Sequence, residues 1–166
     1  WRGVPFYLRS GKRMPAKSSE IVVTFKPVPH SLFRELPPDR MPPNVLVLKI
    51  QPAEGVKLEF QAKQPGPKWC MGTLAMSFKY QEVFGIDPPE AYGRLLLDCM
   101  LGDQTLFWRR EEVEASWSLI TPVLDRWASH PGDCPLKPYT AGSWGPKEAD
   151  GLMVRDGRAW RNSATG

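Results

Sequence analysis

The sequence has few cysteines and few histidines, which argues against several kinds of site. Its three cysteines, Cys70, Cys99 and Cys134, are too far apart for a CxxC pattern or a disulfide framework. We expect them to be buried, reduced thiols. The two histidines, His30 and His130, lie far apart and fall in no catalytic motif. We therefore predict neither a metal site nor a histidine catalyst in this chain.

Long apolar runs are also missing, because no stretch approaches the ~18 residues that a membrane span requires. The hydrophobic content of 42% and the charged content of 24% are close to the averages of globular proteins. The net charge of +4 is modest, and the basic residues are mixed with acidic ones rather than gathered with aromatics. We expect a soluble, cytoplasmic protein that binds neither nucleic acid nor membranes.

Patterns typical of β-strands occupy the first half of the chain. Five segments qualify: residues 4–9, 20–26, 44–51, 56–62 and 72–79. No crossover helix is indicated between them, so the sheet should be mainly antiparallel. The proline-rich residues 27–43 should form a long surface loop.

Helical patterns follow in the second half. Residues 90–101 come after a Pro-Pro pair and end at Gly102, which suits a helix. A longer helix begins near Glu111 and is interrupted by Pro122, where we expect a kink. A short helix is predicted over residues 147–154. The longer helix carries an apolar stripe that should be core, made of Val113, Trp117, Ile120, Leu124 and Trp127. The sequence thus predicts a single α+β domain over residues 1–166, with helices packed against a mainly antiparallel sheet.

One segment has a pattern that points to a function as well as to a fold. Residues 3–13 read GVPFYLRSGKR, and Lys17 follows five residues after Lys12. A lysine after a glycine turn is suited to binding a phosphate group. A solvated basic turn without function is the alternative reading. A Walker A loop is excluded because Phe6 stands where the first glycine is required, and Arg13 stands where Ser or Thr would bind magnesium.

The segment GVPFYLRSGKRM closely resembles the GVPFxxRxGK segment of glucose-6-phosphate dehydrogenases. Further blocks that resemble this family occur in the family's order, at residues 28–33, 43–56, 63–67, 90–117 and 145–150. The resemblance covers nearly the whole chain and corresponds to the C-terminal domain of bacterial-type members. We therefore expect this chain to be the substrate-side part of a longer protein.

The resemblance implies which residues bind substrate. Lys12 and Lys17 correspond to basic residues that contact glucose 6-phosphate in the family, and Gln51 corresponds to a polar residue of the sugar site. A hydrogen bond that closes the strand end is the alternative role for Gln51. NADP would bind to an N-terminal Rossmann domain that this chain lacks, and a homodimer or homotetramer is expected by analogy.

No catalytic residue is expected in this chain. In the family, the histidine base and its carboxylate partner come from segments upstream, so the chain alone should be inactive. We interpret Asp98 and Asp103 as a helix cap and surface ion pairs rather than acid/base catalysts. A stand-alone module that binds sugar phosphates or promotes oligomerisation is the alternative to an enzyme fragment.

Departures from the mammalian members of the family predict that this domain has no second, structural NADP site. Where those members have basic residues, this sequence has Val22, Glu59 and Trp144. Buried phosphates need paired cations, and Glu59 would repel them. Millimolar NADP should therefore leave the midpoint of thermal unfolding of this domain unchanged, because only a ligand of the folded state raises it. A saturable rise that is lost when Trp144 is substituted would contradict this.

Overall fold

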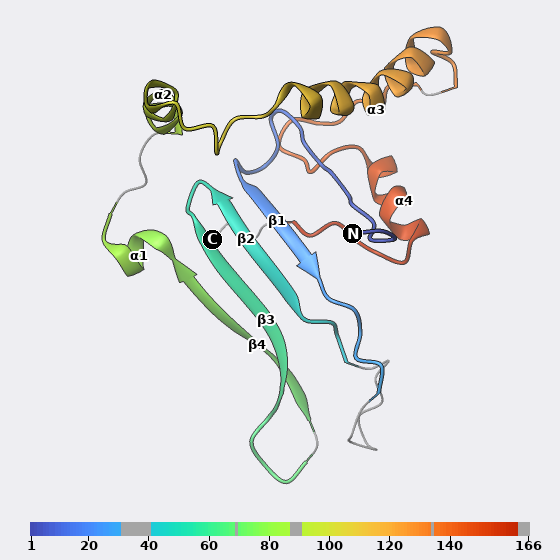
Figure 1. The fold of residues 1–166 in the computed structure, drawn as a ribbon. Coiled ribbons are helices and arrows are strands. Elements are labelled where there is room, and N and C mark those ends of the chain that lie inside the picture. Colours follow the sequence, from blue (N-terminus) through green and yellow to red (C-terminus); the bar gives the residue numbers. More distant parts are fainter. Residues whose placement is uncertain (31–40, 69, 87–90, 134, 163–166) are drawn as a thin grey trace. The chain divides into compact units, whose positions relative to one another are not determined.

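The computed structural model describes residues 1–30, 41–68, 70–86, 91–133 and 135–162 (Figure 1). They divide into two compact units. Unit 1 contains Trp1–Met14 and Pro88–Asn162, and unit 2 contains Pro15–Asp87 and the last four residues. Unit 2 is thus inserted in sequence between the two segments of unit 1. The single domain that the sequence indicates stays a prediction.

Unit 2 is built on one sheet of consecutive antiparallel strands (Figure 1). The strands are β1 (Ser19–Thr24), β2 (Val45–Gln51), β3 (Gly55–Lys63) and β4 (Met71–Lys79), in the order β1-β2-β3-β4. Each strand pairs with the next along the chain. The four strands predicted between residues 20 and 79 are confirmed, with ends that differ by at most two residues. The antiparallel α+β fold class is confirmed with them.

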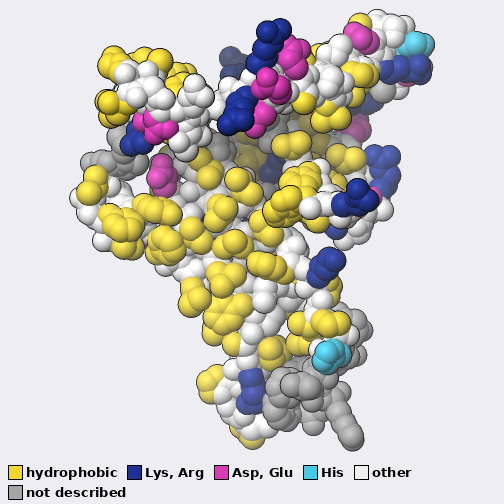
Figure 2. All heavy atoms as spheres, viewed as in Figure 1, with side chains coloured by type: hydrophobic (Ala, Val, Ile, Leu, Met, Phe, Trp, Pro, Cys, Tyr) yellow, Lys and Arg dark blue, Asp and Glu magenta, His cyan; other side chains and the backbone are white. Residues whose placement is uncertain are grey.

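The register of the sheet separates two faces with different chemistry. On one face, apolar residues oppose one another across all four strands, because Ile21 pairs with Leu48, and Leu48 pairs with Val56. The same face continues through Phe78, Met76 and Leu74 on β4. Figure 2 shows hydrophobic side chains gathered over the strands of the sheet. This alternation is what a strand with period two produces when one face is apolar.

The other face of the sheet is mixed. Val47, at its centre, is the most buried hydrophobic residue described, with 2% of its surface exposed. Next to it in register, Lys57 forms an ion pair with Glu59, with 2.8 Å between Nζ and Oε1. Lys57 and Glu59 are two residues apart on β3 and therefore lie on the same face.

A short helix that the sequence did not predict follows the sheet. Helix α1 (Tyr80–Phe84) begins directly after β4 and ends at Gly85, whose φ of 65° is the left-handed conformation common at helix ends. The Tyr80 N–H also donates a hydrogen bond to the carbonyl of Glu54, 3.1 Å away. Five residues are too few to show a helical period, so no pattern could reveal this helix.

Unit 1 contains three longer helices, and all three were predicted. They are α2 (Ala91–Leu101), α3 (Arg110–Ser129) and α4 (Lys147–Arg155). At the start of α3, Glu112 accepts a hydrogen bond from the backbone N–H of Arg109 at 2.8 Å, as in a capping box. Pro122 lies inside α3, and the kink expected there stays a prediction.

The two acidic residues near the end of α2 have local polar partners, but Asp98 is buried rather than part of a surface ion pair, and Asp103 bonds to Thr105 rather than capping a helix. Asp98 has 2% of its surface exposed, and its carboxylate lies 2.9 Å from Nε of Arg94. Asp103 accepts hydrogen bonds from the backbone N–H and the hydroxyl of Thr105. These bonds hold the pKa of Asp103 below its ordinary value.

Three expectations from the sequence are wrong. Residues 4–9 form no strand and pair with none of the described strands; they belong to unit 1, where Tyr7 and Arg9 bond to the C-terminal segment. The apolar stripe of α3 is not core, since its five residues are 38–58% exposed and the described helices of unit 1 make no extensive contact with one another. Cys70 and Cys99 are free thiols, as expected, but both are exposed rather than buried.

Part of the sequence interpretation lies outside the described residues. Cys134 and most of the predicted loop over residues 27–43 belong to that part. Among the helices that are described, none combines the length and the apolar character needed to cross a membrane.

The pairing of β3 with β4 includes a close contact at Gly55. A methyl group there would lie 2.5 Å from the carbonyl oxygen of Phe78, on the neighbouring strand. Gly55→Ala should therefore destabilise the chain by ~1–3 kcal/mol, as overpacking does. Gly93→Ala is the matched control, because its methyl group would meet nothing within 4 Å. Because Gly93 lies on helix α2, Gly93→Ala should stabilise the chain by ~0.5–1 kcal/mol. Denaturant unfolding followed by circular dichroism measures both, and equal effects would contradict the prediction.

Candidate functional site

The basic turn at residues 11–13 is held by the C-terminal segment of unit 1. The hydroxyl of Tyr139 accepts a hydrogen bond from the backbone N–H of Lys12 at 3.1 Å and donates one to the Lys12 carbonyl at 2.7 Å. The backbone N–H of Gly142 donates to the carbonyl of Arg13 at 2.8 Å. Arg13 is the one described non-glycine residue with a positive φ, 52°. Such a conformation is costly, so neighbouring contacts must maintain it.

Arg9 fixes the segment that leads to the turn. Its guanidinium carbon lies 5.0 Å from the ring centres of both Trp144 and Trp160. Its two terminal nitrogens donate hydrogen bonds to Oδ1 of Asn162 at 2.9 Å and to the carbonyl of Arg161 at 3.1 Å. A planar guanidinium can stack on aromatic rings and donate hydrogen bonds from its edge at the same time. This single side chain therefore joins the segment before the turn to four residues of the C-terminal segment.

Tyr7 adds a second polar contact between the same two segments. Its hydroxyl donates a hydrogen bond to Asp156 and accepts one from Arg158 at 3.0 Å. The hydrogen bond with Asp156 raises the pKa of the Tyr7 phenol. Since the hydroxyl then keeps its proton at neutral pH, this contact is lost only as the pH rises above the ordinary tyrosine value of about 10.

The three residues predicted to bind substrate are all exposed, and they belong to different units. Lys12 is in unit 1. Lys17 and Gln51 are in unit 2, where Lys17 stands two residues before β1 and Gln51 is the last residue of β2. The register pairs Ser19 with Gln51, so the structure brings Lys17 and Gln51 to the same end of the β1–β2 pair.

The chemistry available at the turn is that of an exposed cation on a fixed backbone. Among the described residues, the ammonium group of Lys12 has no hydrogen-bond or ion-pair partner, because both of its contacts involve the backbone. Such a group can bind an anion such as a phosphate. The part of the chain that the structure describes gathers no three His, Cys, Asp or Glu side chains that could hold a metal ion.

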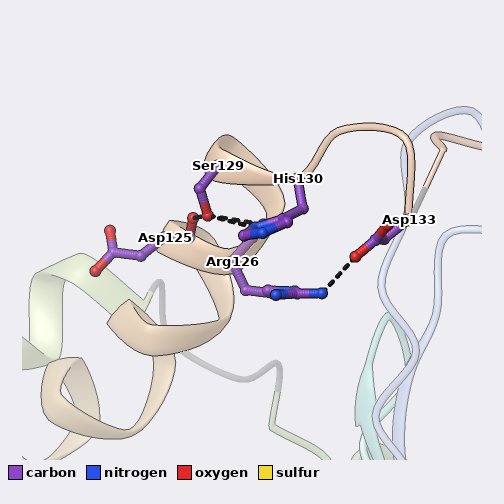
Figure 3. Close-up of polar contacts among 5 residues, drawn as sticks. All are labelled: Asp125, Arg126, Ser129, His130 and Asp133. Carbon is purple, nitrogen blue, oxygen red and sulfur yellow. Dashed lines mark hydrogen bonds and ion pairs between the residues drawn. The ribbon is translucent and has the colours of Figure 1, made fainter.

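A serine next to a histidine occurs at the C-terminal end of α3 (Figure 3). Oγ of Ser129 is 2.9 Å from Nδ1 of His130, but the same hydroxyl donates to the backbone carbonyl of Asp125 at 2.7 Å. Figure 3 shows the Asp125 carboxylate directed away from this pair, and Asp133 forms an ion pair with Arg126. The arrangement lacks an acid that orients the histidine, so it closes the helix end rather than forming a catalytic triad.

Sequence reasoning missed the residues that hold the turn. Tyr139 and Trp160 contribute to this site from positions more than a hundred residues after the turn. No local pattern relates such distant positions. The structure also gives Trp144 a cation, Arg9, as its partner.

Known proteins of one family match this chain over nearly its full length. The family model described as "Glucose-6-phosphate dehydrogenase, C-terminal domain" matches residues 1–161. The glucose-6-phosphate 1-dehydrogenase of Chlamydia pneumoniae is 49% identical over 164 residues, which is 97% of this chain and 32% of that protein. The enzyme of the same name from Rhizobium meliloti is 44% identical over 98% of this chain and 33% of its own length. The chain thus spans about a third of the length of these relatives.

Solved structures have the same fold. A glucose-6-phosphate dehydrogenase in complex with its substrate glucose 6-phosphate superposes with a TM-score of 0.76 at 31% identity, over 92% of this chain and 30% of that one. The glucose-6-phosphate 1-dehydrogenase of Mycobacterium avium gives a TM-score of 0.74 at 34% identity, over 98% of this chain and 32% of that one.

The Arg9 contacts predict that Arg9→Ala loosens the C-terminal segment. Two exposed cation–π contacts of ~0.5–1 kcal/mol each, together with the hydrogen bonds, should be lost. Backbone amides in residues 139–162 should then exchange hydrogen about tenfold faster or more, because local opening becomes easier. Peptide-level hydrogen exchange measures this. Arg2→Ala is the control, since Arg2 lies in the same segment without these contacts, and equal exchange in both variants would refute the role of Arg9.

Proposed function

Since the chain belongs to the glucose-6-phosphate dehydrogenase family, as its C-terminal domain, we propose that it is part of an enzyme that oxidises glucose 6-phosphate with NADP. The reaction transfers a hydride from C1 of the sugar to the nicotinamide and yields 6-phosphogluconolactone. This chain supplies substrate contacts, and the upstream part of the full-length protein supplies the base. The observation that carries the proposal is the exposed Lys12, fixed by its backbone within a family-specific segment.

The proposed roles follow from charge and position. Lys12 and Lys17 bind the phosphate group, since a lysine ammonium attracts a phosphate whose charge is spread over three oxygens. Gln51 donates or accepts a hydrogen bond at a sugar hydroxyl, close to Lys17 because both lie at the same end of the β1–β2 pair. Binding the phosphate far from C1 uses a non-reacting part of the substrate to orient the reacting carbon.

The residues described here do not fit the nicotinamide cofactor. Dinucleotide-binding domains present a glycine-rich turn between a strand and a helix within a parallel sheet. The sheet that the structure describes has only antiparallel pairs. We therefore assign NADP to the upstream part of the full-length protein and derive no step of the reaction through it. For the same reason we expect this chain alone to be inactive.

Homo-oligomerisation through the sheet is a further part of the proposal. Several apolar side chains on one face of the sheet are 44–59% exposed, among them Ile21, Met76 and Phe78. An apolar face of this kind suits contact with a second subunit, in keeping with the homodimer or homotetramer expected for the family.

The proposed phosphate contacts predict a specific loss of substrate affinity. In the full-length protein, Lys12→Ala or Lys17→Ala should raise the KM for glucose 6-phosphate about ten- to a hundredfold, because a hydrogen bond to a charged group contributes ~1.5–3 kcal/mol. The KM for NADP should barely change. Steady-state kinetics with each substrate varied in turn measures both constants.

Lys26→Ala provides the matched control for Lys17→Ala. Both lysines are exposed, and they flank β1 at opposite ends. Lys26→Ala should leave both constants unchanged. A parental KM for glucose 6-phosphate in both the Lys12 and the Lys17 variants would show that the phosphate assignment is wrong. A full-length protein that binds the sugar phosphate but produces no NADPH would favour the binding module instead.

A further inference from the structure

The contact between Tyr139 and the basic turn is unusually specific. One phenolic hydroxyl satisfies both backbone groups of Lys12, as acceptor for the N–H and as donor to the carbonyl. These two residues are 127 positions apart in the sequence but belong to the same unit. The Lys12 side chain is left unpaired among the described residues while its backbone is fixed.

Close packing around the Tyr139 hydroxyl also helps to fix the backbone of the turn. A methyl group added to Gly11 would lie 3.0 Å from the Tyr139 hydroxyl oxygen and 3.1 Å from the sulfur of Met14. A side chain at this position would therefore crowd the Tyr139 hydroxyl and the Met14 sulfur, and one of them would have to shift by a few tenths of an ångström. On the other side of Lys12, the left-handed Arg13 is held by its hydrogen bond from Gly142. Lys12 is thus constrained on both sides.

We propose that Tyr139 is a positioning residue that acts through Lys12 in substrate binding. A lysine side chain is a flexible stem, so the place that its ammonium can reach depends on where its Cα is held. By bonding both backbone groups of Lys12, Tyr139 removes motion of the turn that would otherwise be lost on binding. This inference rests on the proposed function, since it assumes that Lys12 binds the phosphate of glucose 6-phosphate.

Tyr139→Phe in the full-length protein is the direct test, because it removes the hydroxyl and keeps the ring. The KM for glucose 6-phosphate should rise roughly three- to tenfold, as expected for loss of one or two neutral hydrogen bonds. The turnover number kcat and the KM for NADP should stay close to those of the parent. Tyr92→Phe is the matched control, since Tyr92 is on α2 of the same unit and is 80% exposed. It should change none of these constants.

A double-mutant cycle with Lys12→Ala distinguishes positioning from a general structural role. If Tyr139 acts through Lys12, Tyr139→Phe should cause no further rise in KM once Lys12 is alanine. Gly11→Ala gives an independent check, because it keeps the hydroxyl but crowds it, and it should raise the KM in the same selective way.

The outcomes separate the two proposals. If Lys12→Ala raises the KM but Tyr139→Phe does not, the positioning role fails and the phosphate assignment stands. Equal rises caused by Tyr139→Phe with and without Lys12 would also overturn the positioning role. If Lys12→Ala has no effect on the KM, the phosphate assignment fails, and the positioning role fails with it.

Discussion

Docking of the first fourteen residues on the C-terminal segment is the interaction on which unit 1 depends. Arg9 lies between the indoles of Trp144 and Trp160 and also donates hydrogen bonds from its edge. The described helices of this unit make no extensive contact with one another, so these polar and aromatic contacts take the place of a shared core. The same contacts fix the basic turn, because Arg9 and Lys12 are only three residues apart. Stability and the candidate binding site therefore have a common origin here.

The sheet of unit 2 follows a different principle. Its strands pair in sequence order, and the register sets apolar residues opposite one another on one face across all four strands. A shift of one residue in any strand would turn this face over, so the pattern specifies its own register. That register also determines that Gln51 and Lys17 lie at one end of the β1–β2 pair. The arrangement of these two residues is thus a consequence of the apolar pattern.

The strands and helices that local sequence patterns determine could be predicted from the sequence. A nearly continuous apolar run identified β2, alternation identified β3 and β4, and the helical period with a Pro-Pro start and glycine end identified α2. Local patterns failed for residues 4–9, whose composition is that of a strand but whose partners are in the distant C-terminal segment. The helical period of the α3 stripe predicts a core, yet a period alone does not supply a packing partner. Resemblance to the family selected Lys12, Lys17 and Gln51, but no sequence pattern could reveal that Tyr139 holds Lys12.

The insertion of unit 2 into unit 1 has a consequence for synthesis on the ribosome. Contacts in the sheet join neighbouring strands, so unit 2 can begin to form as soon as residues 19–79 have emerged. Residues 7–13 have to wait, because their partners from Tyr139 to Asn162 are translated more than a hundred residues later. Until then Tyr7 and Arg9 have no hydrogen-bond partners in unit 1. The turn that carries Lys12 is therefore among the first parts of this chain to be made and among the last to be fixed in place.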